Sequence, residues 1–306
     1  MRAPILGLYL AAIGGSVVFA QEHVTITPRA RPERTLALRA NLRTDVHLVQ
    51  IPVTVTDPAG APILGLSEAS FRIFEDEVER PIASLSVSDA PISAGIIFDT
   101  SRSMKPRIAD TRAALDEFLK TTNILDEFFL VRFSDTAELA APFTRNPSDL
   151  WHALDGVEAK GWTALNDAII LGTQHVRKGK YQRKSLVVLT DGNDNNSRYS
   201  EGELLSILRE ADVRVYALSI IERSRFVQKI CDETGGRAIW VRHMTDLPAA
   251  VEDLSNHIRS EYIVSYSPAS LQNDGRYHRV RVEVQPPPGM AKVYPAWRRG
   301  YVAPEQ

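Results

Sequence analysis

Short apolar segments alternate with helical patterns between residues 93 and 260, and this alternation limits the fold more than any other feature of the chain. The apolar segments are "SAGIIFD", "FFLVRFS", "SLVVLTDG", "VRVYALSI" and "RAIWVR". Between them, apolar side chains recur at helical spacing, for example from Leu165 to Val176 and from Leu247 to Ile258. Alternating β and α elements form a mostly parallel sheet with helices on both faces. We therefore predict a doubly wound α/β domain of the Rossmann-like type.

Both flanks of this region show the period-two alternation of antiparallel strands. Before it, "VQIPVTV" alternates, and "SFRIFEDEVERPIASLSV" predicts two more strands around an acidic turn at Glu75 to Glu77. After it, "EYIVSYSP" and "HRVRVEV" alternate in the same way. Each flank has too few strands to be stable alone, and domain termini often lie close together. We predict that residues 44–91 and 261–306 form one β-sandwich, with the α/β domain inserted at 92–260.

The first twenty residues are typical of a secretory signal peptide. Arg2 precedes an apolar run from Ile5 to Phe19, and Val18 and Ala20 place small residues before a cleavage site. The run is short for a membrane span of about 20 residues, although an uncleaved anchor helix is the alternative. We expect residues 1–20 to be removed and residues 21–43 to form a linker. The protein would then be exported, to the periplasm, the medium or the cell surface.

Charge and cysteine content exclude some classes of partner and of chemistry. The formal net charge is −2, from 36 Lys and Arg against 38 Asp and Glu, so nothing favours nucleic acid or an anionic membrane as the main partner. The single cysteine, Cys231, cannot form an intrachain disulfide, and we expect it in the core.

Oxygen-bearing side chains occur where three loops are predicted to meet. Asp99, Ser101 and Ser103 follow "GIIF", Thr163 lies in "KGWTALNDAI", and Asp191 ends "SLVVLTD". Loops after parallel strands converge on one edge of a doubly wound sheet, so these side chains could share a site. A set without imidazole or thiolate favours Mg²⁺, Mn²⁺ or Ca²⁺. We prefer Mg²⁺, because two carboxylates and three hydroxyls suit a small ion that retains waters.

Simpler explanations exist for parts of this set. Asp and Ser are common turn residues, and Ser103 could cap the helix that follows. Arg102 could select an acidic partner or merely face solvent. Asp194, in "GNDNNSRYS", could hold a second cation or only form a turn. We keep Arg102 and Asp194 as candidate ligand-binding residues.

The three motifs together resemble a known family. "IIFDTSRSM", "GWTALNDAI" and "VVLTDG" are similar to the loops of the von Willebrand factor type A domain and its metal-ion-dependent adhesion site. This resemblance covers about residues 92–260. Over about residues 44–303 the chain also resembles exported bacterial proteins described as VWFA-related, a family of poorly defined function.

The resemblance implies roles for individual residues. Ser101 and Ser103 would bind the metal directly, Thr163 directly or through water, and Asp99 and Asp191 mainly through water. A glutamate or aspartate of a partner protein would complete the coordination. The last helix of the domain, here at about 245–259, would move together with the site.

Enzyme chemistry is harder to place on this chain. "FDTS" and "SDTA" resemble the paired turns of aspartic proteases, but that chemistry needs two matched carboxylates in symmetric β surroundings. His175 lies in a predicted helix and has no evident catalytic partner. We predict a non-enzymatic, metal-dependent protein-binding module. The alternative is a structural scaffold protein in which the metal site is vestigial or only ties the loops together.

Overall fold

The strand β5 (Ile92–Asp99) is buried along its whole length, at the centre of a six-stranded sheet. The computed structural model describes residues 48–220, 223–268, 274–290 and 292–303. The sheet has the order β10-β9-β8-β5-β6-β7, and only β7 is antiparallel to its neighbour. The other strands are β6 (Glu127–Phe133), β7 (Ala137–Thr144), β8 (Arg183–Thr190), β9 (Arg214–Ile220) and β10 (Ala238–Val241).

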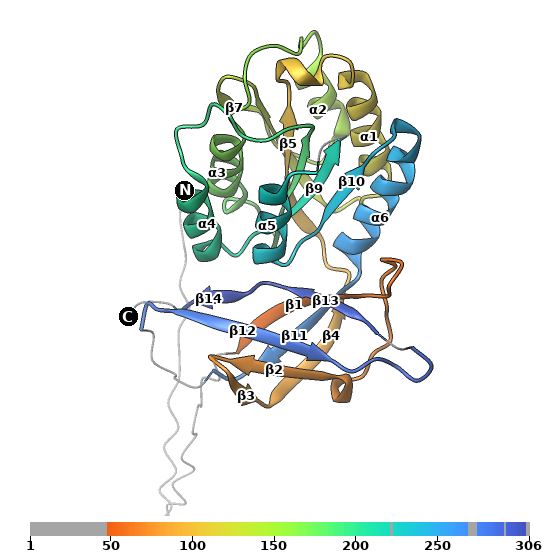
Figure 1. Ribbon diagram of the computed structural model, residues 1–306, viewed down its shortest axis with the longest axis vertical. Coiled ribbons are helices and arrows are strands. Elements are labelled where there is room, and N and C mark those ends of the chain that lie inside the picture. The colour runs from red at the N-terminus through yellow and green to blue at the C-terminus, as the bar shows by residue number, and fades with distance from the viewer. Residues whose placement is uncertain (1–47, 221–222, 269–273, 291, 304–306) are drawn as a thin grey trace, which may run out of the picture. The chain divides into compact units, whose positions relative to one another are not determined.

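Helices cover both faces of this sheet, as Figure 1 shows. One face carries α1 (Ile108–Lys120), α2 (Pro147–Leu154) and α6 (Leu247–Arg259), and the other carries α3 (Leu165–Val176), α4 (Glu201–Glu210) and α5 (Arg225–Thr234). Side chains alternate along β5, so that Ile96 and Phe98 join the first core and Ile97 joins the second. The predicted doubly wound α/β fold is confirmed.

Local signals explain where two of these helices begin and end. Ser200 and Glu203 form a capping box at the start of α4, in which each side chain accepts a hydrogen bond from the backbone N–H of the other residue. The helix α5 ends at Gly235, whose φ of 74° is left-handed and therefore favours glycine. Three short 3-10 turns also occur, η1 (Glu68–Ser70), η2 (Arg102–Met104) and η3 (Met244–Asp246).

Strands from both ends of the described chain form two four-stranded antiparallel sheets. One sheet has the order β13-β1-β11-β4 and the other β14-β12-β2-β3. Their bounds are β1 (Val49–Thr56), β2 (Phe71–Glu75), β3 (Val78–Arg80), β4 (Ile82–Ser88), β11 (Glu261–Tyr266), β12 (Tyr277–Val284), β13 (Tyr294–Trp297) and β14 (Gly300–Val302). The inner faces share one apolar core that includes Ile51, Ile73, Val264 and Val282. The two flanks therefore form one sandwich, and the α/β domain follows β4 and precedes β11.

The acidic turn and Pro81 divide one region into more strands than the sequence predicts. "SFRIFEDEVERPIASLSV" forms three strands, not two. Asp76 and Glu77 have φ values of 48° and 66° and make the tight turn between β2 and β3. Pro81 has no N–H to donate, so pairing stops there, and β4 joins the other sheet. The sequence analysis also missed β7, β13 and β14, which lie at sheet edges and lack a clear alternation.

The predicted signal peptide (1–20) and linker (21–43) lie outside the described residues, so the structure does not test them. In the part of the chain that is described, no helix combines the length and the apolar character that a membrane crossing needs.

Glu261 joins the sandwich to the α/β domain through a buried ion-pair network. It is the first residue of β11, only 1% exposed, and its Oε2 accepts hydrogen bonds from Arg183 Nη2 at 2.8 Å and Arg214 Nη2 at 2.6 Å. The hydroxyl of Tyr216 donates to Oε1 at 3.1 Å. Arg183 and Arg214 begin β8 and β9, so the network lies at the amino-terminal edge of the parallel sheet.

Replacing Glu261 by glutamine should lower the free energy of unfolding by about 3–5 kcal/mol, because two buried guanidinium groups would lose their counter-charge. Urea denaturation measures this change. The matched control is Glu283→Gln, which removes an exposed carboxylate that pairs with Arg72 at 3.1 Å and should change stability little. Equal effects of the two substitutions would show that the buried network is not a main source of stability.

Candidate metal centre

The carboxyl ends of β5 and β8 lie side by side at the point where the strand order of the sheet reverses. The chain leaves β5 through α1 toward β6 on one side, and leaves β8 through α4 toward β9 on the other. The two strands are paired in parallel up to Phe98 and Leu189. Crevices at such reversal points are where doubly wound sheets bind ligands. Asp99 is the last residue of β5, and Asp191 directly follows the last residue of β8.

Asp99 is fully buried, and both of its carboxylate oxygens accept hydrogen bonds. Oδ1 accepts from the backbone N of Ser101 at 2.8 Å, and Oδ2 accepts from the hydroxyl of Thr190 at 2.6 Å. Burial raises the pKa of Asp99 to about 6; these hydrogen bonds oppose the rise, and the nearby charge of Asp191 adds to it. A positive charge placed beside Asp99 would therefore be stabilised.

The two serines connect the first loop to Asp191. The hydroxyls of Ser101 and Ser103 are 3.1 Å apart, and the Ser103 hydroxyl donates to Asp191 Oδ1 at 2.8 Å. Ser103 is exposed, whereas Ser101 and Asp191 are buried, so solvent reaches the site from the Ser103 side. Ser103 makes no side-chain cap on α1, which begins at Ile108. The capping explanation for this serine is therefore wrong.

Thr163 lies in a loop that is hydrogen-bonded to both of the other loops. The backbone N of Arg102 donates to Gly161 O at 3.1 Å, which ties this loop to the first one. The backbone N of Thr163 donates to Asn195 Oδ1 at 2.8 Å, and its carbonyl accepts from the backbone N of Asn195 at 3.0 Å. Its hydroxyl makes no hydrogen bond with another described residue and is available as an oxygen donor.

The two candidate ligand-binding residues differ in their surroundings. Arg102 is exposed, and its guanidinium has no ion pair within the described ranges. Asp194 Oδ1 instead accepts hydrogen bonds from the backbone N of Asn166 at 3.2 Å and from the Ser197 hydroxyl. The Ser197 contact is local and fits the turn that we gave as the alternative for Asp194, whereas the Asn166 contact holds the start of α3. Ligand binding by either residue stays a prediction.

Sequence reasoning missed two residues of the site. Thr190 holds Asp99, and Arg107 donates through Nη1 to Asp191 Oδ2 at 2.7 Å and to the carbonyl of Ser103 at 3.1 Å. Thr190 stands inside the motif "VVLTDG", so its place before Asp191 was a usable signal. Arg107 has no such signal, because nothing in the sequence indicates which way its side chain turns.

The residues present fit a small, hard divalent cation. Asp99, Ser101, Ser103, Thr163 and Asp191 offer two carboxylates and three hydroxyls, a donor set that suits Mg²⁺ better than zinc or copper. The guanidinium of Arg107 pairs with Asp191, so this carboxylate already holds one positive charge beside it. Across the described ranges, no three side chains of the His, Cys, Asp and Glu types gather into a potential metal site.

The side chains considered for a catalytic role are engaged in packing contacts or in hydrogen bonds to the backbone. The His175 ring stacks on Phe143 with ring centroids 5.2 Å apart and meets Phe129 edge-on at 4.6 Å. Cys231 is fully buried in the core, as predicted, and burial raises the pKa of its thiol. Asp135, the second carboxylate of the protease reading, accepts a hydrogen bond from the backbone N of Trp162 at 2.8 Å. No hydrogen bond between described atoms joins Asp135 to Asp99.

Comparisons with known proteins concern the domain that carries the site, not the site itself. Residues 96–193 match the family model of the von Willebrand factor type A domain, and the chain therefore contains a von Willebrand factor type A domain. Inter-alpha-trypsin inhibitor heavy chain H4 of Bos taurus is 24% identical over 218 residues, which are 65% of this chain and 24% of that protein. The chain thus spans about a quarter of the length of this relative.

One solved structure shares this fold, and others are similar over the α/β domain. A von Willebrand factor type A protein from Catenulispora acidiphila has a TM-score of 0.52 at 11% identity, and the match covers 85% of this chain and 75% of that one. The protein BatB from Bacteroides thetaiotaomicron has a TM-score of 0.46 at 18% identity, covering 55% of this chain and 100% of that one. The first similarity extends beyond the α/β domain and, at this low identity, concerns the fold alone.

Asp99 should make the metal-free protein less stable as the pH rises from about 4 to about 6. Its pKa is about 6 in the folded protein and 3.8 ordinarily, so the folded state binds the proton more tightly across this window and loses stability as the proton leaves. The full effect is about 3 kcal/mol. Urea denaturation with a chelator present should show the stability of the native chain falling relative to Asp99→Asn between these pH values. A native chain whose stability stays constant or rises relative to Asp99→Asn over this pH range would contradict the assignment.

Proposed function

We propose that this protein is a metal-dependent protein-binding module that holds a divalent cation, preferably Mg²⁺, at the carboxyl edge of its parallel sheet. Von Willebrand factor type A domains are mostly interaction modules, and the chain contains one. The observation that carries the proposal is the connected set of Asp99, Ser101, Ser103 and Asp191, whose side chains meet where the strand order reverses.

Each residue has a distinct part in this proposal. The hydroxyls of Ser101, Ser103 and Thr163 would hold the cation, and the carboxylates of Asp99 and Asp191 would balance its charge. Asp99 fixes the first loop, because it accepts the backbone hydrogen bond of Ser101 while Thr190 holds its other oxygen. The bound cation would supply a positive centre with an open coordination position. The glutamate or aspartate of a partner protein is the group that such a centre accepts.

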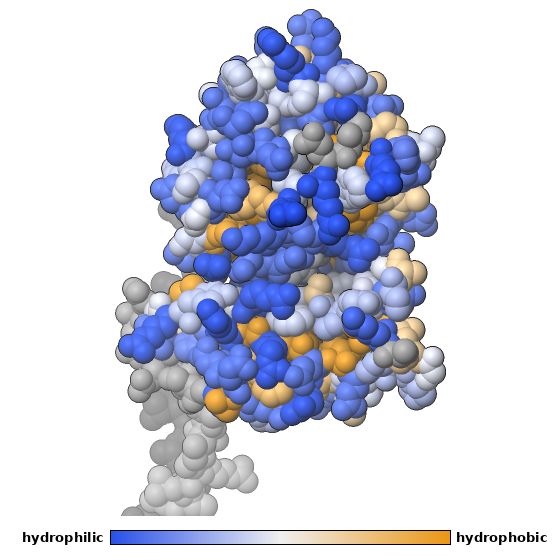
Figure 2. Space-filling view, viewed as in Figure 1, coloured by the Kyte–Doolittle hydropathy of each residue, from blue (hydrophilic) through white to orange (hydrophobic). Residues whose placement is uncertain are grey.

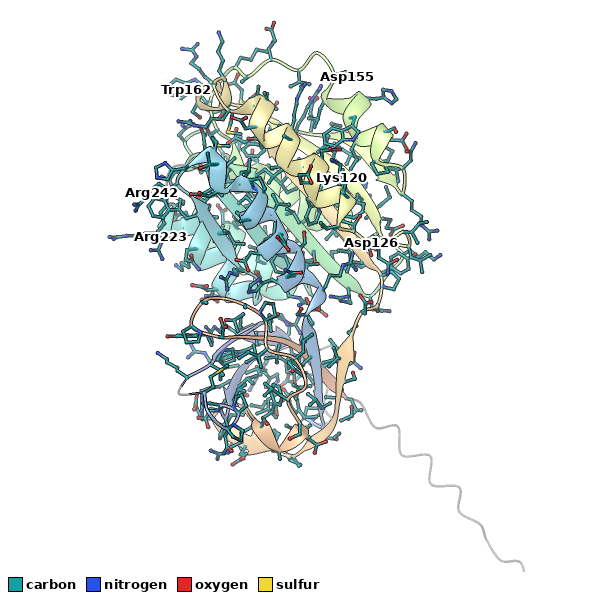
Figure 3. All side chains as sticks on the ribbon, turned by 90° about the vertical axis from the view of Figure 1, so that its right-hand side faces the viewer. Lys120, Asp126, Asp155, Trp162, Arg223 and Arg242 are labelled. Carbon is teal, nitrogen blue, oxygen red and sulfur yellow. The ribbon has the colours of Figure 1, made fainter. Side chains whose placement is uncertain are left out.

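The surface around the site suits an acidic protein partner. Arg102 is exposed on the loop that carries the serines, and it adds positive charge there. Trp162, next to Thr163, is 65% exposed, and Figure 3 places it at the upper end of the α/β domain. Hydrophilic residues cover most of this end in Figure 2. Exposed aromatic and arginine side chains are enriched where proteins bind one another.

The metal site is tested by calorimetric titration of the chain from Gln21 with Mg²⁺, Mn²⁺ and Ca²⁺. The double substitution Ser101→Ala, Ser103→Ala should weaken Mg²⁺ binding by about 100-fold or more, because it removes two oxygen ligands. Ser84→Ala, Ser86→Ala is the matched control, since these serines have the same spacing on β4 and are exposed in the sandwich. Equal Mg²⁺ binding by the native chain and the Ser101/Ser103 variant, or none by the native chain, would favour the structural role.

Export is part of the proposal and rests on residues 1–20 alone. Expression of the whole chain in a bacterial host should yield protein outside the cytoplasm whose first residue is Gln21, because the apolar run ends in a small-residue cleavage pattern. N-terminal sequencing of the purified protein measures this. A chain that retains residues 1–20 and remains with the membrane would support the uncleaved anchor.

A further inference from the structure

Arg107 places a positive charge against the carboxylate that a metal would approach. Its Nη1 lies 2.7 Å from Asp191 Oδ2, and the same nitrogen donates to the carbonyl of Ser103 at 3.1 Å. The Arg107 side chain is 25% exposed, whereas that of Asp191 is 2% exposed. This is the only ion pair that Arg107 makes with the described residues. The guanidinium therefore lies between the buried site and the solvent from which a ligand would come.

Arg107 changes the net charge of the site in each of its binding states. With both carboxylates ionised, Asp99, Asp191 and Arg107 together carry −1, and the site carries +1 once it holds a divalent cation. One carboxylate from a partner then brings the total to zero. Without Arg107 the corresponding totals are −2, 0 and −1, so the metal alone already neutralises the site. The partly buried position makes these differences matter, because charges there are poorly screened.

We propose that Arg107 couples the two binding events: it weakens metal binding by the free protein and makes a partner's carboxylate strengthen that binding. The inference rests on the proposed metal site. A bound cation neutralises the charge of Asp191 and so weakens the ion pair between Asp191 and Arg107. Because the guanidinium is partly exposed, it can then pair with the carboxylate of the partner. Coupling of this kind is reciprocal, so bound metal raises the affinity for the acidic group by the same factor.

Backbone contacts make the substitution of Arg107 practicable. Its carbonyl accepts hydrogen bonds from the backbone N of Thr111 at 2.9 Å and from the Thr111 hydroxyl at 3.0 Å, and these survive a change of side chain. Arg107→Gln removes the charge, and Arg107→Lys retains it. The matched control is Lys105→Gln, which removes one positive charge from the same loop at an exposed position without an ion pair in the described structure.

The experiment is calorimetric titration with Mg²⁺ of the native chain and the three variants, with and without saturating acetate as the carboxylate probe. In the native chain, acetate should raise the Mg²⁺ affinity about fivefold or more. Without acetate, Arg107→Gln should bind Mg²⁺ about tenfold more tightly than the native chain. Acetate should raise the Mg²⁺ affinity of this variant less than that of the native chain. Arg107→Lys should keep most of the coupling, and Lys105→Gln should resemble the native chain.

Three results would overturn the inference, and they differ in what they leave standing. Native and Arg107→Gln proteins with equal Mg²⁺ affinity and equal gain from acetate would reject the role of Arg107 and leave the metal site intact. Absence of Mg²⁺ binding in every variant, with acetate as well as without, would reject the metal site and the inference together. A Lys105→Gln variant that matches Arg107→Gln would assign the effect to general surface charge and so reject it.

Discussion

The parallel pairing of β5 with β8 is the constraint on which the rest of the structure depends. Both strands are almost wholly buried, so each must be hydrogen-bonded on both sides and apolar on both faces. Neighbours come so close that a Cβ atom on Gly95 would lie 2.2 Å from the Phe129 ring, and one on Gly172 of α3 would lie 2.6 Å from Ile97. This tight packing fixes the strand ends. Because the strand ends are fixed, the side chains that follow them lie close together.

The two edges of the parallel sheet have different roles, one in joining the domains and one in forming the candidate site. At the amino-terminal edge, Glu261 binds Arg183 and Arg214 and so joins the first residue of β11 to the start of β8 and β9. At the carboxyl edge lie Asp99 and Asp191 with their serines. The helix α6 packs against α1, which follows the site loop, and it ends at Arg259, with only Ser260 between it and Glu261. Motion of this last helix together with the site, which the family resemblance implies, stays a prediction, but the packing provides a continuous connection.

The candidate site was predictable because its main residues follow strands that the sequence reveals. An apolar run that ends in Asp99, and another that ends in Asp191, can be recognised without knowing the neighbours in space. Arg107 could not be found in this way, since its contact with Asp191 joins residues that are far apart in the chain and depends on the direction of a flexible side chain. The same holds for Glu261, whose role in joining the domains comes entirely from residues of other strands.

The sequence by itself determined the class of fold, most elements of the α/β domain and which oxygen-bearing side chains come at the ends of its strands, because hydrophobic periodicity and strand ends are local properties. Tertiary structure decided the contacts between residues that are far apart in the chain, which local sequence patterns cannot predict. It placed β4 in the opposite sheet from β3 although only Pro81 separates them, and it made edge strands of β13 and β14, whose pairing comes from distant partners. It also set a guanidinium against Asp191, because only the folded chain brings Arg107 within hydrogen-bonding distance of that carboxylate.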